Sequence, residues 1–199
     1  MNNSTNYTTQ NDLLLKNLMS FYKTDNSNGI HNPNNNLDKM LKIITGESKI
    51  SLRIVDWFAT NYAKKYYTLY IIEGTNDNIT RRFKVYDDYK LKLKAYSKKR
   101  FDPFCRWDRI SIPYTTGKFI ETTIGQLNFF KWALENNVVN YIEQNYNEIE
   151  KDMNNRNSTS KRKELIVDNT KTRKKREELS VSATKSIKKE KVEIIVQFN

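Results

Sequence analysis

The chain has 199 residues, 37% of them hydrophobic, and its 35 Lys and Arg against 23 Asp and Glu give a formal net charge of +12. Its single Cys and single His exclude an intrachain disulfide framework and a zinc site built only from this chain's Cys and His. No apolar run approaches the ~20 residues that cross a bilayer, so we expect a soluble intracellular protein without membrane contacts.

The positive charge is concentrated in two parts of the sequence. Residues 79–118 contain twelve basic and four acidic side chains, and residues 151–199 contain fourteen and seven. Residues 119–150, which lie between them, contain one basic and five acidic side chains. Charge clustered in this way attracts polyanions and is typical of nucleic-acid-binding proteins.

Residues 1–48 are rich in Asn, Ser and Thr, and we expect most of them to be flexible because such a composition buries too little apolar surface. Two short amphipathic stretches interrupt this segment, at residues 13–21 and 37–44. They dock either on the folded core or on a second copy of the chain.

Residues 49–153 are predicted to form the core. Ser51 is a good N-cap for a helix that runs to Tyr67. Residues 67–72 and 82–86 predict two strands joined by a turn.

Residues 87–101 fit both a strand and a helix, because Tyr and Leu alternate with Lys but also recur at helical spacing. We favour the helix, which Asp102-Pro103 would end. Short strands are expected at residues 109–114 and 119–120.

Thr123 and Gln126 form a capping-box pattern before an apolar run that extends to Ile149. This run predicts one long helix, or two helices joined near Asn136-Asn137. Beyond Met153 the composition changes, and residues 154–190 are predicted to be a basic arm or loop. Residues 191–199 are predicted to be a strand that joins the core.

These elements together predict an α+β fold. We expect a single small domain with a short sheet and a long helix in its C-terminal half, flanked by the disordered Asn-rich N-terminus and the basic arm or loop.

Two clusters of cations are the candidate nucleic-acid-binding residues, because Lys and Arg neutralise phosphates and release condensed counterions. For the cluster at residues 161–176, the alternatives are a solvated charge run and a nuclear import signal. Aromatic residues are interleaved with the cluster around residues 98–106. They either stack on bases or, as we favour, belong to the core. The first cluster is Lys161, Arg162, Lys163, Lys171, Arg173, Lys174, Lys175 and Arg176, and the second is Lys98, Lys99, Arg100 and Arg106.

Motifs for catalysis are absent from the sequence: it contains neither a phosphate-binding Gly-rich loop nor a metalloprotease helix. Cys105 is better explained as a structural thiol than as a nucleophile. Asp88-Tyr89-Lys90 matches half of the pattern of some metal-dependent nucleases, but the upstream acid is not evident. We therefore predict no catalytic residues, no metal and no cofactor, and keep a nuclease as a minor alternative.

Three segments resemble a family of small basic proteins of nucleocytoplasmic large DNA viruses, the mimivirus-like giant viruses, to which no biochemical role is assigned. They are residues 89–106, residues 122–133, and residues 173–186 with the strand that follows. The resemblance covers about residues 50–199 and leaves the Asn-rich start outside. It implies a viral origin, in the virion core or in the viral factory in the host cytoplasm.

From charge and resemblance together we expect a non-enzymatic, largely sequence-independent DNA-binding protein that coats, condenses or packages a viral genome. The alternative is an interaction scaffold or transcription accessory factor that binds an acidic protein partner or RNA. DNA is favoured over RNA as the partner, and a second copy of the chain is a further candidate.

Overall fold

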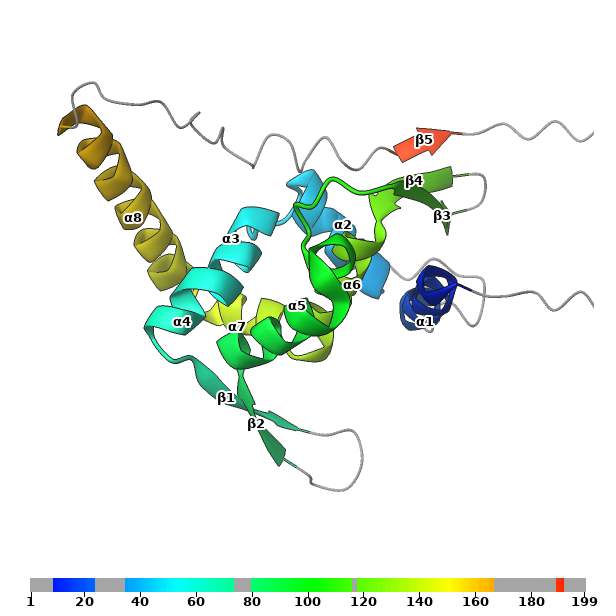
Figure 1. Cartoon of the computed structure of the whole chain (residues 1–199), viewed down its shortest axis with the longest axis horizontal. Coiled ribbons are helices and arrows are strands. Elements are labelled where there is room, and N and C mark those ends of the chain that lie inside the picture. The colour runs from blue at the N-terminus through cyan, green and yellow to red at the C-terminus, as the bar shows by residue number, and fades with distance from the viewer. Residues whose placement is uncertain (1–8, 24–34, 74–79, 116–117, 167–188, 192–199) are drawn as a thin grey trace, which may run out of the picture.

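The computed structural model describes residues 9–23, 35–73, 80–115, 118–166 and 189–191, and for residues 23, 115, 118, 157–166 and 189–191 it describes the backbone (Figure 1). The helices, in chain order, are α1 (Gln10–Lys23), α2 (Asn36–Thr45), α3 (Leu52–Trp57), the π-helix η1 (Phe58–Tyr62), α4 (Ala63–Lys65), α5 (Val85–Phe101), α6 (Ile124–Glu135), α7 (Val138–Gln144) and α8 (Tyr146–Ile166). The strands are β1 (Leu69–Glu73), β2 (Thr80–Lys84), β3 (Arg109–Thr115), β4 (Lys118–Thr123) and β5 (Lys189–Lys191).

The fold is mixed α+β, as the sequence predicts, but the strands form two sheets and not one. β1 and β2 are an antiparallel pair, and the second antiparallel sheet has the order β3-β4-β5. Figure 1 shows the β1–β2 pair extending from one side of the helical body, while the second sheet lies on another side. The two sheets therefore lie on different sides of the helical body.

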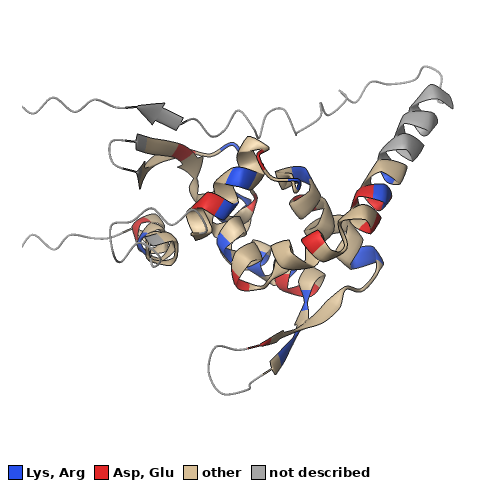
Figure 2. Cartoon of the chain, turned by 180° about the vertical axis from the view of Figure 1, so that it is seen from behind, with Lys and Arg blue, Asp and Glu red and all other residues tan. Residues whose placement is uncertain are grey.

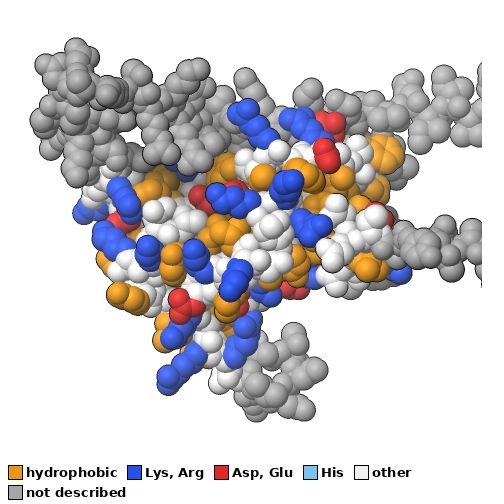
Figure 3. Space-filling view, viewed as in Figure 1, with side chains coloured by type: hydrophobic (Ala, Val, Ile, Leu, Met, Phe, Trp, Pro, Cys, Tyr) orange, Lys and Arg blue, Asp and Glu red, His pale blue; other side chains and the backbone are white. Residues whose placement is uncertain are grey.

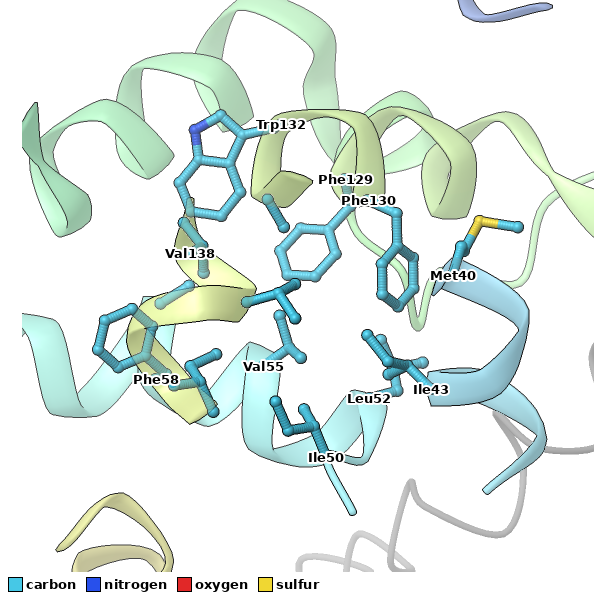
Figure 4. Packing of buried hydrophobic residues seen from close by; sticks show 14 of the residues in the cluster. Met40, Ile43, Ile50, Leu52, Val55, Phe58, Phe129, Phe130, Trp132 and Val138 are labelled. Atoms are coloured by element: carbon cyan, nitrogen blue, oxygen red, sulfur yellow. The ribbon is translucent and has the colours of Figure 1, made fainter. Parts of the chain in front are cut away.

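The hydrophobic core is built mainly from α2, α3, η1, α6 and α7. Figure 4 shows Phe129 and Phe130 of α6 pointing toward Val55 of α3 and Ile43 of α2. Phe58, Phe129 and Phe130 are fully buried, and each side chain of this size contributes roughly 1.5–3 kcal/mol when it leaves water.

Both predicted helix starts are confirmed. The hydroxyl of Ser51 accepts a hydrogen bond from the Ile54 amide, and that of Thr123 accepts one from the Gln126 amide. These contacts satisfy amides of the first turn that have no partner within the helix.

The amphipathic stretches of the N-terminal segment are α1 and α2, and they dock on the core of the same chain. Leu18 and Tyr22 of α1 are buried, and the Tyr22 hydroxyl donates to the Leu127 carbonyl at 2.7 Å. Asp38 of α2 accepts a hydrogen bond from the Tyr114 hydroxyl at 2.6 Å. The core therefore extends to the N-terminal side of residue 49, and the remaining expectation of flexibility falls on residues outside those described.

The long apolar run after Thr123 is divided into separate helices. Asn137 separates α6 from α7 in the left-handed conformation, with φ 54°, which Asn tolerates better than most residues. A second break at Asn145 separates α7 from α8. The alternative of two helices joined near Asn136-Asn137 is thus the correct one, and α8 follows as a third.

The C-terminal part differs from the expectation in two respects. Residues 154–166 continue α8, where the sequence predicts the start of a basic arm or loop. Within the described residues β5 pairs with β4 antiparallel, with Phe119 opposite Glu190, and it shares only residue 191 with the strand predicted at residues 191–199. This strand precedes residues 192–199, which lie outside the described part of the chain.

The ends of α5 and α6 approach each other closely at Gly125. A Cβ atom placed there would lie 2.9 Å from the Asp102 carbonyl oxygen and 3.2 Å from that of Lys99. Both neighbours are backbone atoms, so only glycine permits this contact, which fixes the basic end of α5 against the start of α6.

Candidate nucleic-acid interface

Residues 85–101 form helix α5, as we favour from the sequence, and this helix separates cations from aromatic side chains. Lys90 and Lys94, one turn apart, are exposed. On the opposite side Tyr89 and Phe101 are buried and contact Trp132 at ring distances of 5.8 and 5.9 Å. The expectation that the interleaved aromatics belong to the core is confirmed for these two buried rings, which cannot stack on bases. Tyr96 and Phe104 are half-buried against the core, and Trp107 is half-buried.

A break in α5 at Ser97 redirects its last turn. Ser97 has φ 64° and ψ 166°, a conformation that is populated almost only by glycine. After the break Lys98 and Lys99 are exposed, whereas Arg100 is half-buried and its Nε donates to Asn11 of α1 at 2.8 Å. Arg100 thus joins α5 to α1, and Lys98 and Lys99 are left as the cations at this end of the helix.

The segment after α5 places two further predicted positions. Nζ of Lys99 lies 3.8 Å from the centre of the Trp107 ring, a cation–π contact. Arg106 is exposed between α5 and β3. Cys105 is a free, half-buried thiol.

The C-terminal cluster is only partly described. Lys161, Arg162 and Lys163 lie in the last turns of α8, which extends away from the helical body in Figure 1, and their side chains are outside the described set. Lys171, Arg173, Lys174, Lys175 and Arg176 lie outside the described residues. Their assignment as phosphate contacts stays a prediction.

The structure adds cations that we did not assign to a site from the sequence, namely those of β2. Arg82 and Lys84 are exposed, and Arg81, on the other face of the strand, donates to the side-chain oxygen of Asn136. Figure 2 shows basic positions along this strand. The net charge of residues 79–118 already includes the cations of β2. The sequence alone does not tell which face of this strand is exposed to solvent.

The described basic positions of β2 and α5 are continuous in the chain, because α5 begins at Val85, directly after Lys84. In the space-filling view of Figure 3, Lys and Arg side chains outnumber acidic ones from the projecting hairpin across the face above it. Lys84 has a loose contact with Asp87 at 4.0 Å, and both side chains are largely exposed. Such a pair contributes little and leaves Lys84 accessible to a phosphate.

A cleft of about 460 Å³ is lined by residues of α1, β2, α5 and α6. Its polar groups bond to one another: the Trp132 indole donates to Asp88 at 2.6 Å, and Lys131 donates to Asn17. The cleft is a hydrogen-bonded junction of four elements. Asp88, the first residue of the nuclease-like pattern, is therefore a helix residue bonded to a core indole.

A second open cleft, of about 760 Å³, separates α4 from α8. Its Asp152 accepts hydrogen bonds from Lys65, from the Tyr66 hydroxyl and from the Trp57 indole. Burial acts to raise the pKa of Asp152, but these hydrogen bonds outweigh it and hold the pKa below its ordinary value. This carboxylate connects α8 to α3 and α4.

Asp56 of α3 is a half-buried carboxyl group whose environment favours the protonated form. Burial, with the negative charge of Asp102 as a second cause, raises the pKa of Asp56 to about 7. Within the described residues, no three or more His, Cys, Asp or Glu side chains are grouped so that they could hold a metal ion. None of the described helices is long and apolar enough to cross a membrane.

These features define a small basic protein of mixed α+β fold with an exposed cationic face. Its sequence matches a family of unknown function, DUF7197, over residues 1–198, and the chain belongs to that family. It is 46% identical over 130 residues to uncharacterized protein L507 of Acanthamoeba polyphaga mimivirus. The match covers 63% of this chain and 49% of L507, so it spans about half the length of that relative.

The resemblance to giant-virus proteins drawn from the sequence is thereby confirmed. No solved structure matches the chain.

Proposed function

We propose that this protein is a non-enzymatic, largely sequence-independent DNA-binding protein that coats, condenses or packages a viral genome. The observation that carries the proposal is the set of exposed cations on β2 and α5, two elements that follow each other directly in the chain. Its members are Arg82, Lys84, Lys90, Lys94, Lys98 and Lys99.

Several properties of this surface suit a phosphate backbone better than a small ligand. The cations are exposed and spread along a strand and a helix, and they do not converge on one cavity. Lys90 and Lys94 are separated by one helical turn, a rise of about 6 Å. A linear array of this kind neutralises successive phosphates without reading bases.

The basic arm would add a second phosphate-binding segment. Residues 161–176 contain eight of the predicted contacts, in a part of the sequence distant from α5. Two separated segments could bridge two duplexes, which is what condensation requires. With a mimivirus protein as a relative, we place this activity in the virion core or in the viral factory in the host cytoplasm.

The test is a titration of the purified protein with duplex DNA, single-stranded DNA and RNA at several salt concentrations. We expect duplex DNA to bind best, with a log–log salt slope of roughly −4 to −8, since each neutralised phosphate contributes about −0.9. Absence of binding even at low salt would overturn the proposal and favour an acidic protein partner.

A pair of variants with matched charge tests the assignment of α5. Lys90, Lys94 and Lys98 are replaced by Ala in one variant, and the exposed Lys16, Lys39 and Lys42 of α1 and α2 in the control. The α5 variant should bind all duplex sequences more weakly, with a salt slope shallower by about 2 to 3. An equal loss in both variants would mean that net charge, and not α5, determines binding.

The basic arm is tested separately by replacing residues 173–176 with Ala. If the arm contacts phosphates, affinity falls similarly for all sequences and the salt dependence flattens. Unchanged affinity would remove this cluster from the interface.

A further inference from the structure

The β1–β2 hairpin has two faces, and the inner face fixes it to the helical body. Tyr70 stacks on Tyr141 of α7 at 5.0 Å, and its hydroxyl donates to the Asn136 carbonyl at 2.7 Å. Opposite Tyr70 on β2, Phe83 is buried. An isolated two-stranded hairpin is marginally stable in water, so this anchoring is what allows the ribbon to project (Figure 1).

The outer face combines two exposed aliphatic side chains with two cations, and Glu73, paired with Thr80, is its one carboxylate among the described residues. Leu69 is 46% exposed and Ile71 is 65% exposed. Their cross-strand partners on the same face are Lys84 for Leu69 and Arg82 for Ile71. Single exposed apolar residues are ordinary, but here two aliphatic residues on one strand are each paired with a cation.

The pairing of aliphatic and cationic side chains indicates what would cover this face. The described part of this face carries two cations, Arg82 and Lys84, against one carboxylate, Glu73, so a second copy packing face to face would bring together two surfaces of the same net charge, which repel. A duplex offers phosphates to the cations and stacked base pairs to the aliphatic groups. Proteins that bind the minor groove use aliphatic side chains in this way, inserting them between base steps and bending the DNA.

We propose that the outer face of the β1–β2 hairpin enters the minor groove of duplex DNA, where Leu69 and Ile71 separate a base step and bend the helix axis. Arg82 and Lys84 bind the flanking phosphates, and the lysines of α5 continue the contact along the backbone. This inference rests on the proposed function. It adds that the DNA is a duplex bound in its minor groove and that binding bends it.

The experiment measures affinity and bending on the full chain. A duplex labelled at its two ends with a donor and an acceptor dye reports bending as a rise in energy transfer. The variant Leu69→Thr/Ile71→Thr removes the aliphatic groups and keeps strand-forming residues. The control is Leu91→Ala on α5, because Leu91 is 65% exposed, as Ile71 is. Circular dichroism verifies that both variants fold.

We expect the double variant to lose the rise in energy transfer and about tenfold in affinity, since two aliphatic groups no longer leave water. Its salt slope should be unchanged, because no charge is removed. Leu91→Ala should bind and bend as the wild type does. Wild-type protein that binds with a steep salt slope but does not bend the duplex would overturn this inference and leave the proposed function standing.

Absence of any binding by the wild type would overturn both proposals. A parallel titration with phosphatidylcholine–phosphatidylserine vesicles tests an anionic membrane as the alternative partner, because such a membrane also binds aliphatic and basic residues together. Vesicle binding that the double variant loses, with DNA binding and bending unchanged, would assign this face to membranes and overturn the inference.

Discussion

Asp88 and Trp132 join α5 to α6 through one hydrogen bond whose donor is buried. The indole Nε1 lies 2.6 Å from Oδ1 of Asp88, and Trp132 is 3% exposed. An indole N–H in such a place has no water to replace a lost partner, so the carboxylate matters more than its position in the first turn of α5 suggests.

Replacing Asp88 with Ala should therefore lower the free energy of unfolding by about 1–3 kcal/mol. Asp88→Asn keeps an acceptor oxygen and should recover most of the loss. Asp87→Ala is the control, since Asp87 is also in the first turn and has an exposed side chain. Urea unfolding followed by tryptophan fluorescence measures all three, and equal losses for Asp87→Ala and Asp88→Ala would mean that the helix dipole, not the indole, is responsible.

At the scale of elements, α5 shows how far sequence reasoning reaches. Its helix could be predicted because Tyr and Leu recur at helical spacing, although they also alternate with Lys as in a strand. The break at Ser97 could not be predicted, because Ser carries no signal for a left-handed conformation and tertiary packing imposes it. The break also decides which predicted cations remain accessible, since Arg100 turns toward α1.

The backbone conformation of Ser97 predicts the sign of the change in the free energy of unfolding when this residue is replaced by glycine. Ser97→Gly should raise the free energy of unfolding by about 1 kcal/mol, because glycine adopts the observed φ and ψ without strain. Ser97→Ala, which keeps Cβ, should change stability little. If α5 were a regular helix in solution, glycine would instead destabilise it by about 1 kcal/mol. Thermal unfolding of the three proteins side by side distinguishes the two cases.

The hairpin illustrates a different limit. Its two strands could be predicted from residue type and turn signals, and the structure confirms both within a few residues. The face that packs inward could not be predicted, because hydrophobic residues occupy both faces of β1, Tyr70 and Ile72 on one and Leu69 and Ile71 on the other. That choice depends on Tyr141 and Asn136, which are distant in sequence. For this reason the sequence alone does not show that Arg82 and Lys84 share an exposed face.

At the scale of the whole molecule, the charged side chains fall into two groups, those exposed to solvent and those that join structural elements. Exposed cations of β2 and α5 are available to a partner, whereas several acidic groups hold elements together. Asp152 fixes α8, and Asp38 joins α2 to Tyr114. The net charge of the sequence therefore does not tell which charged residues are structural. The contributions of Asp56 and Asp152 to stability depend on pH, because the pKa of each carboxyl group is shifted in the folded protein.

The pH dependence of stability follows from the opposite pKa directions of these two carboxyl groups. The pKa of Asp56 is raised from 3.8 to about 7 in the folded protein, so the folded state binds its proton more tightly than the unfolded state does. Its effect is to lower stability as pH rises from about 4 to about 7, and to leave it constant above. The pKa of Asp152 is lowered, so its contribution is present above the unfolded pKa and is lost as the pH falls through the folded value.

Asp56→Asn removes the ionisation and should stabilise the protein by roughly 2 to 4 kcal/mol at pH 8, an advantage that shrinks toward pH 4. Asp152→Asn is the matched control with the opposite sign: it should be less stable than the wild type at pH 8, by a margin that closes in acid. Urea unfolding of the three proteins from pH 4 to pH 8 measures both differences. A constant offset for Asp56→Asn across this range would show that its carboxyl group titrates normally in the folded chain, and that the burial beside Asp102 is relieved in solution.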